Sequence, residues 1–149
     1  ILGEETFFDA YQTYAERWAN KHPTPYDFFN TFEDVADRDL DWFWRGAFYE
    51  TWTMDHAVQS VEQTEEGVVV TVADRGQLLM PVFVQATYDD GRTVTRRVGV
   101  KKWLEGERTV EVTLAPGTLT SVTLDAEKML PDLDRTNNDW KPEETEMSP

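Results

Sequence analysis

The sequence predicts an α+β protein, in which three short N-terminal helices precede a small antiparallel β-sandwich of about six to seven strands. Apolar residues follow the helical period of 3.6 through the first third of the chain, and the strand period of two from about Ala57 onward. In the second part, turn sequences recur roughly every 8–12 residues, which is typical of antiparallel sandwiches. Apolar residues make up 40% of the composition, so a hydrophobic core is available.

The first helix is predicted over residues 4–21. Its first turn is acidic and its last turn is basic, which complements the helix dipole, and Pro23 then ends it. Apolar side chains at positions i, i+1, i+4, i+8 and i+11 would form one stripe along this helix. The stripe consists of Phe7, Phe8, Tyr11, Ala15 and Trp18.

A second helix is predicted from Thr24 to about Ala36. Thr24 can cap the helix, Pro25 suits its first position, and Asp27 lies three residues after the cap. The apolar positions that continue the period are Phe28, Phe29, Phe32 and Val35.

The third helix is predicted in a segment, residues 39–52, where six of fourteen residues are aromatic. Asp39 would cap it, and apolar residues then repeat at i, i+3, i+4 and i+8, which indicates a buried stripe. These residues are Leu40, Phe43, Trp44 and Phe48.

Six strand regions follow the helices. Asp90-Gly91 is the strongest hairpin signal in the chain, and Gly67 separates the first two strands. The last two strands are predicted to pair with each other around residues 115–117. The strand regions begin near Val58 and Val61, and continue at 68–72, 80–88, 93–100, 109–114 and 119–124.

The patterns divide the chain into three parts. Residues 1–56 form the helical segment, residues 57–135 the β-sandwich, and residues 136–149 a polar tail that we expect to be frayed. Because the chain begins at Ile1 and helix-like sequence follows within a few residues, we expect it to be a segment of a longer polypeptide.

The charge of the chain disfavours two classes of partner. Fourteen basic and 29 acidic residues give a net charge of −15, which repels nucleic acid and anionic membranes. The acidic residues are scattered, which favours a generally acidic surface, as in proteins from saline habitats, over one face for a basic partner. No apolar run approaches the roughly 18 residues of a membrane span, so membrane insertion is not predicted. Without cysteine there is no disulfide and no thiolate ligand.

The motifs of catalytic and metal sites are missing or incomplete in this sequence. Neither histidine, His22 nor His56, belongs to an H-E-x-x-H motif, and the serines lack a G-x-S-x-G elbow. Asp39 and Asp41 beside two tryptophans could serve a glycosidase, but the helical stripe explains this segment better. Residues 132–143 resemble a calcium loop but lack its central glycine. We therefore predict no catalytic, cofactor-binding or metal-binding residue in this chain.

Two blocks of sequence resemble the end of the catalytic domain of gluzincin zinc aminopeptidases, the aminopeptidase N-like metallopeptidases. Residues 21–35 are Lys-His-Pro-Thr-Pro-Tyr-Asp-Phe-Phe-Asn-Thr-Phe-Glu-Asp-Val, and residues 39–49 are Asp-Leu-Asp-Trp-Phe-Trp-Arg-Gly-Ala-Phe-Tyr. Residues 2–8 are similar to the helix that follows the catalytic tyrosine segment of this family. Residues 133–140, Leu-Asp-Arg-Thr-Asn-Asn-Asp-Trp, resemble the close of its β-sandwich domain.

The resemblance implies that this chain is a non-catalytic C-terminal portion of a zinc aminopeptidase. The zinc, its ligands and the catalytic tyrosine would lie upstream of Ile1, in a catalytic domain that acts on peptides and is the expected partner of this chain. The aromatic segment would bury the junction between helices and sandwich. An isolated chain would then self-associate through exposed aromatics such as Trp18, Phe28 or Trp44. The alternative is a free-standing β-sandwich module that binds a peptide or carbohydrate.

Overall fold

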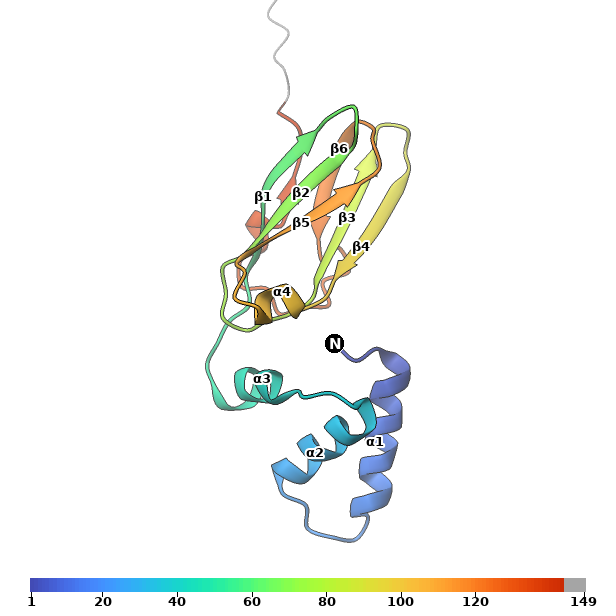
Figure 1. Ribbon diagram of the computed structural model, residues 1–149, viewed down its shortest axis with the longest axis vertical. Coiled ribbons are helices and arrows are strands. Elements are labelled where there is room, and N and C mark those ends of the chain that lie inside the picture. The colour runs from blue at the N-terminus through green and yellow to red at the C-terminus, as the bar shows by residue number, and fades with distance from the viewer. Residues whose placement is uncertain (144–149) are drawn as a thin grey trace, which may run out of the picture. The chain divides into compact units, whose positions relative to one another are not determined.

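The protein, represented by a computed structural model that describes residues 1–143, folds as two compact units, of which the first is Ile1–Thr51 and the second begins at Trp52 (Figure 1). Within the described residues, helices come first and are followed by seven strands in two antiparallel sheets, which confirms the predicted fold class. The boundary lies five residues earlier than the predicted one, because the segment before the first strand belongs to the second unit. Met54, for example, forms a bridge with Asp132 and accepts a hydrogen bond from Leu133 N.

The first unit contains α1 (Glu4–Trp18), α2 (Pro25–Ala36) and α3 (Asp41–Trp44), which continues as a π-helical segment, Arg45–Tyr49. The three predicted helices are therefore present. The first ends three residues early, because Asn20 adopts the left-handed conformation with φ of 59°. Lys21 Nζ donates to the carbonyl of Arg17 and so satisfies one of the last carbonyls of α1.

The start of α2 follows from its capping sequence. The backbone N–H and hydroxyl of Thr24 both donate to the carboxylate of Asp27, at 2.7 and 2.8 Å, and Pro25 is the first helical residue. At the other end, Asp37 is left-handed and donates its N–H to the carbonyl of Glu33. The predicted bounds of this helix are confirmed, because local residues determine both of its ends.

The buried face of α1 differs from the predicted stripe. Phe7, Phe8 and Tyr11 are exposed, and the helix buries Ala10 instead. A small residue at this position lets α1 approach α2 closely, while the rings of the stripe lie toward the edge of the contact. Phe48, expected in the buried stripe of the third helix, is also exposed. The buried apolar residues of this unit are Ala10, Phe29, Phe32, Leu40 and Trp44.

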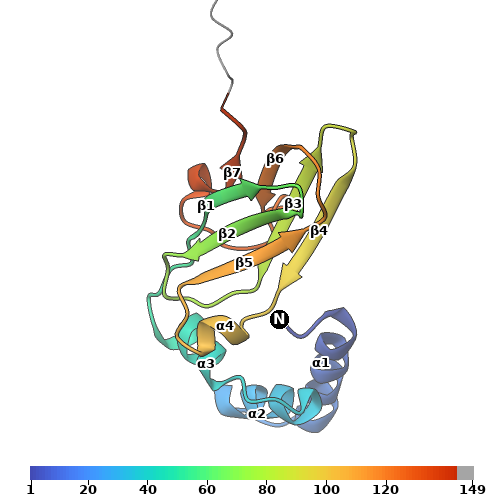
Figure 2. The same cartoon turned by 45° about the horizontal axis from the view of Figure 1, so that its top comes forward.

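The second unit is a β-sandwich whose two sheets are visible in Figure 2. One sheet has the order β1-β2-β5 and the other the order β4-β3-β6-β7, and a short helix, α4 (Lys101–Leu104), connects β4 to β5. The strands are β1 (His56–Gln63), β2 (Val68–Asp74), β3 (Val82–Tyr88), β4 (Thr93–Val98), β5 (Thr109–Leu114), β6 (Leu119–Leu124) and β7 (Asp139–Trp140).

Alternate residues of the strands point into the space between the sheets. Val68, Val70 and Val72 on β2 are fully buried, as are Val82 and Val84 on β3. The six strand regions predicted from the sequence correspond to β1 to β6, whereas β7 was not predicted.

The hairpin predicted at Asp90-Gly91 joins β3 to β4. Tyr88 O accepts from Gly91 N, and Tyr88 N donates to Arg92 O at 2.9 Å. Gly91 has a φ of 82°, which an L-residue other than glycine adopts at a cost. The connection is a three-residue loop with glycine in its left-handed position.

The predicted pairing of the last two strands is wrong. β5 pairs with β2 and β6 pairs with β3, so the connection between them passes from one sheet to the other. Tyr88 fixes this crossing, because its hydroxyl donates to Ala115 O at 2.8 Å and its ring lies against Gly117. The turn sequence at residues 115–117 indicated that the chain reverses direction, but not which sheet the next strand joins.

The sandwich also extends beyond residue 135. Arg135–Asn137 form a 3-10 turn, and Trp140 in β7 pairs with Val122 in β6. The part of the predicted frayed tail up to residue 140 therefore belongs to the fold, and residues 144–149 lie outside the described residues.

A substitution at Gly76 tests the packing of the segment that enters β1. A Cβ at Gly76 would lie 2.7 Å from Asp55 N and 2.9 Å from Met54 Cα, and closer still to Thr53 O. Because these are backbone atoms, Gly76→Ala should lower the free energy of unfolding by about 2–3 kcal/mol in urea denaturation. Gly99→Ala is the matched control, since a Cβ there meets nothing within 4 Å. Equal stabilities of the two variants would contradict this account.

Candidate functional site

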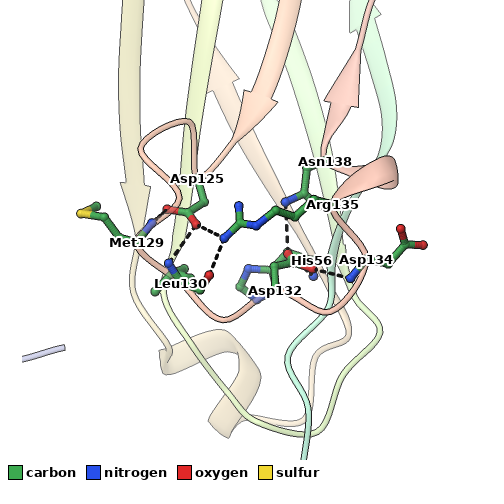
Figure 3. A network of polar contacts seen from close by, with 8 residues as sticks. All are labelled: His56, Asp125, Met129, Leu130, Asp132, Asp134, Arg135 and Asn138. Atoms are coloured by element: carbon green, nitrogen blue, oxygen red, sulfur yellow. Dashed lines mark hydrogen bonds and ion pairs between the residues drawn. The ribbon is translucent and has the colours of Figure 1, made fainter.

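The largest group of connected polar side chains lies at one end of the sandwich, where the segment after β6 meets the start of β1 (Figure 3). Asp125 is 3% exposed and left-handed, with φ of 44°. Its carboxylate accepts from Met129 N and Leu130 N, both at 2.9 Å, and from Arg135 Nη2 at 3.0 Å. Arg135 also donates to Leu130 O. An ion pair between the buried Asp125 and the partly exposed Arg135 thus holds both ends of the segment.

Asp132 connects the same segment to β1 and to the chain before β7. One oxygen accepts from His56 N and Asn138 Nδ2, both at 3.2 Å, and the other accepts from Asp134 N at 3.1 Å. Asp134 in turn accepts from the N–H and hydroxyl of Thr136, and these bonds lower the pKa of its carboxyl. The carboxylates of the candidate calcium loop therefore accept hydrogen bonds from the protein itself. Their arrangement serves to tie three segments of the sandwich together.

His56 is the buried histidine of this network. It is 2% exposed, and its ring centre lies 5.9 Å from that of Trp103. Desolvation lowers the pKa of His56 to about 4, and it outweighs the opposite effect of the carboxylates of Asp132, Asp55 and Asp125. The imidazole is therefore neutral near pH 7, and its Nε2 has no hydrogen-bond partner among residues 1–143.

The two histidines belong to different units, because His22 lies on the exposed connection between α1 and α2. Within residues 1–143, the one group of at least three metal-ligand side chains with close donor atoms contains neither of them.

That group consists of three carboxylates, Glu33, Asp39 and Asp41, whose oxygens lie within 4.8 Å of one another. Glu33 Oε1 accepts from Leu40 N at 2.8 Å and from Trp44 Nε1 at 3.2 Å, and Asp39 accepts from Asp41 N. These bonds shape the turn between α2 and α3. Trp44 is buried in the helical core, where it does not form a platform for a sugar, so the geometry disfavours the glycosidase hypothesis.

A buried carboxylate that belongs to none of the sequence motifs described above lies at the end of β2. Asp74 is 3% exposed, and desolvation raises the pKa of its carboxyl despite an ion pair with Arg108 at 3.1 Å. Arg108 also donates to Gly76 O. The alternation of residues along β2 places Asp74 on the same inward face as its buried valines, so the burial of this carboxylate could have been predicted from the sequence. The pair closes the end of the β2–β5 ladder.

Six large aromatic side chains of the helical unit are between 44% and 64% exposed. We call them the aromatic surface. Phe7 contacts Phe8 and Tyr11, with ring centres 5.6 and 6.2 Å apart. The other three rings each contact the buried Phe29. The six residues are Phe7, Phe8, Tyr11, Tyr26, Phe48 and Tyr49.

The residues expected to mediate self-association differ from this set. Trp44 is buried, and Trp18 and Phe28 are half-buried. Sequence period alone indicated that one face of each helix is apolar, but not which rings the neighbouring helix covers.

Comparisons with protein-family models and with curated proteins found no match to this chain. Within residues 1–143, none of the helices has the length and apolar character that are needed to cross a bilayer.

Proposed function

We propose that this chain is a non-catalytic C-terminal portion of a zinc metallo-aminopeptidase, and that it supports a catalytic domain of the same polypeptide. The aromatic surface is the observation that carries this proposal. The helical unit, Ile1–Thr51, buries five apolar residues but leaves six large aromatic rings exposed. Clusters of exposed apolar side chains of this kind mark a site that another protein surface covers.

The resemblance of residues 21–35 and 39–49 to gluzincin aminopeptidases supports the catalytic domain as the covering surface. Buried rings give large contact areas, since a Phe or Tyr side chain buries about 150–250 Å². Contact through the aromatic surface would hold the helices against the catalytic domain and shape its peptide cleft. Zinc in that domain would activate the water that hydrolyses the N-terminal peptide bond of the substrate. No residue of this chain is assigned a catalytic role.

Two measurements test the proposal. The DNA upstream of the codon for Ile1 should encode an H-E-x-x-H motif in the same reading frame. The whole polypeptide should cleave an aminoacyl anilide and lose this activity on chelation, whereas residues 1–149 alone should not. A start codon close to Ile1 would favour the free-standing module. Chelator-sensitive cleavage by the isolated chain would contradict the assignment of a non-catalytic role.

A further inference from the structure

One stretch of the sandwich has a charge opposite to that of the rest of the protein. Residues 91–104 contain five basic residues and no acidic one, although the chain as a whole has a net charge of −15. Ion pairs with acidic neighbours lie near its two ends, where Asp90 lies 3.7 Å from Arg92 and Glu105 lies 3.7 Å from Lys101. The basic residues are Arg92, Arg96, Arg97, Lys101 and Lys102.

Six of these fourteen residues form β4, which is an outermost strand of its sheet. Within the described residues, the register of β4 against β3 runs without a shift from Thr93 to Val98. The other outer strand of the sheet, β7, has two residues, and β1 in the opposite sheet has a register shift between Val58 and Ser60. The second outer strand of that sheet, β5, pairs with β2 without a shift but contains no basic residue. Short or bulged edges resist pairing with a further strand, whereas a regular edge such as β4 offers its backbone groups for it.

The hairpin fixes which backbone groups of β4 point away from the sheet. Tyr88 N donates to Arg92 O, so these two residues form a hydrogen-bonded pair. Because such pairs alternate along an antiparallel ladder, the N–H and C=O of every second residue of β4 point toward β3. Among the remaining residues, Thr93 and Thr95 point theirs away from β3, toward the edge of the sheet.

Arg96 would make this edge favour acidic strands over apolar or basic ones. It lies opposite Val84 in the register, so it shares the inward-facing side of β4 with two valines, yet it is exposed at the edge. Its guanidinium donates to Thr95 O at 3.2 Å. A cation at this position disfavours an apolar or basic strand, whereas an incoming carboxylate can pair with it.

We propose that the edge of β4 binds an extended, acidic segment of another protein, which adds to the sheet as a further strand. Backbone hydrogen bonds to Thr93 and Thr95 would hold the segment, and its carboxylates would pair with basic side chains of this edge such as Arg96. This inference is independent of the proposed aminopeptidase function, because it depends on the sandwich alone.

Fluorescence anisotropy with a labelled octapeptide of alternating Glu and Thr tests the proposal, with a Lys/Thr octapeptide as the control ligand. The acidic peptide should bind residues 1–149, and its affinity should fall as salt rises from 0.05 to 0.5 M, by roughly tenfold or more because exposed charges are then screened. Arg96→Glu should weaken binding by roughly tenfold or more, since it replaces attraction by repulsion.

A proline at an edge position isolates the backbone contribution. Thr95→Pro removes an N–H that points away from β3, so it should leave the sheet folded and abolish binding of the acidic peptide. Thr113→Pro is the matched control on β5, one of the two outer strands of the other sheet. There Asp74 N donates to Arg108 O, and the same alternation points the N–H of Thr113 outward. This variant should bind normally, and circular dichroism should show both variants folded.

Four results of the binding experiments would each overturn the proposal. They are equal binding of the two peptides, no binding up to millimolar concentration, normal binding by folded Thr95→Pro, and equally effective competition by phosphatidylserine vesicles. Sedimentation that shows dimers, with NMR shift changes confined to β4, would assign the edge to a second copy of this chain and would also overturn it.

Discussion

Replacing Asp125 by alanine should lower the free energy of unfolding of the sandwich by about 4 kcal/mol, measured by urea denaturation. The carboxylate is almost fully buried and accepts three hydrogen bonds, two from backbone N–H groups and one from Arg135. Alanine would leave the two backbone N–H groups without this acceptor and the guanidinium without its counter-charge. It would also place a residue that disfavours left-handed geometry at a φ of 44°.

Two further variants separate these contributions. Asp125→Asn keeps the shape and tolerates the left-handed backbone but removes the charge, so a loss of about 2 kcal/mol is expected. Asp139→Ala removes an exposed carboxylate that accepts from the hydroxyl of Thr123, and it should change stability by at most about 0.5 kcal/mol. If Asp125→Ala were no more damaging than Asp139→Ala, the segment after β6 would not depend on this ion pair.

The parts of the fold that sequence predicted are those set by neighbouring residues. Thr24, Pro25 and Asp27 lie within four positions, and their capping geometry is formed as expected. Asp90 and Gly91 likewise mark the β3–β4 turn. The pairing of β5 with β2 was missed because any inward-facing apolar strand fits either sheet, and the choice depends on the whole core.

The polar network was beyond prediction for a related reason. Its contacts join residues far apart in the chain, such as His56 N and Asp132, which are separated by 76 positions. Spacing within the Asp- and Asn-rich segment resembled an incomplete calcium loop, because the same oxygen atoms accept hydrogen bonds or bind cations. The donors that decide between these roles come from β1 and from the segment around Asn138. Only the folded arrangement brings them to the carboxylates.

Acid should destabilise the sandwich through His56. The pKa of this side chain is about 4 in the folded protein, against an ordinary value of 6.5. His56 therefore binds a proton more readily in the unfolded chain than in the folded protein. Its contribution to the free energy of unfolding is complete above pH 6.5 and is lost as pH falls from 6.5 to 4. The difference between these two pKa values corresponds to a loss of about 3 kcal/mol in the free energy of unfolding. Asp74, whose pKa is raised by desolvation, acts in the opposite direction, since its folded form accepts a proton more readily.

Replacing His56 separates the effect of this histidine on acid stability from that of Asp74. His56→Gln removes the titrating group, so its free energy of unfolding should start lower at pH 7 but vary less between pH 6.5 and 4 than that of the parent chain. The contribution of Asp74 is common to both proteins and cancels in their difference. His22→Gln changes the other histidine, which lies on an exposed turn, and should keep the parental pH dependence. Urea denaturation at half-unit pH steps measures all three curves. Parallel curves for His56→Gln and the parent would show that the buried imidazole does not cause the acid sensitivity, and carboxylates elsewhere in the sandwich would then have to supply it.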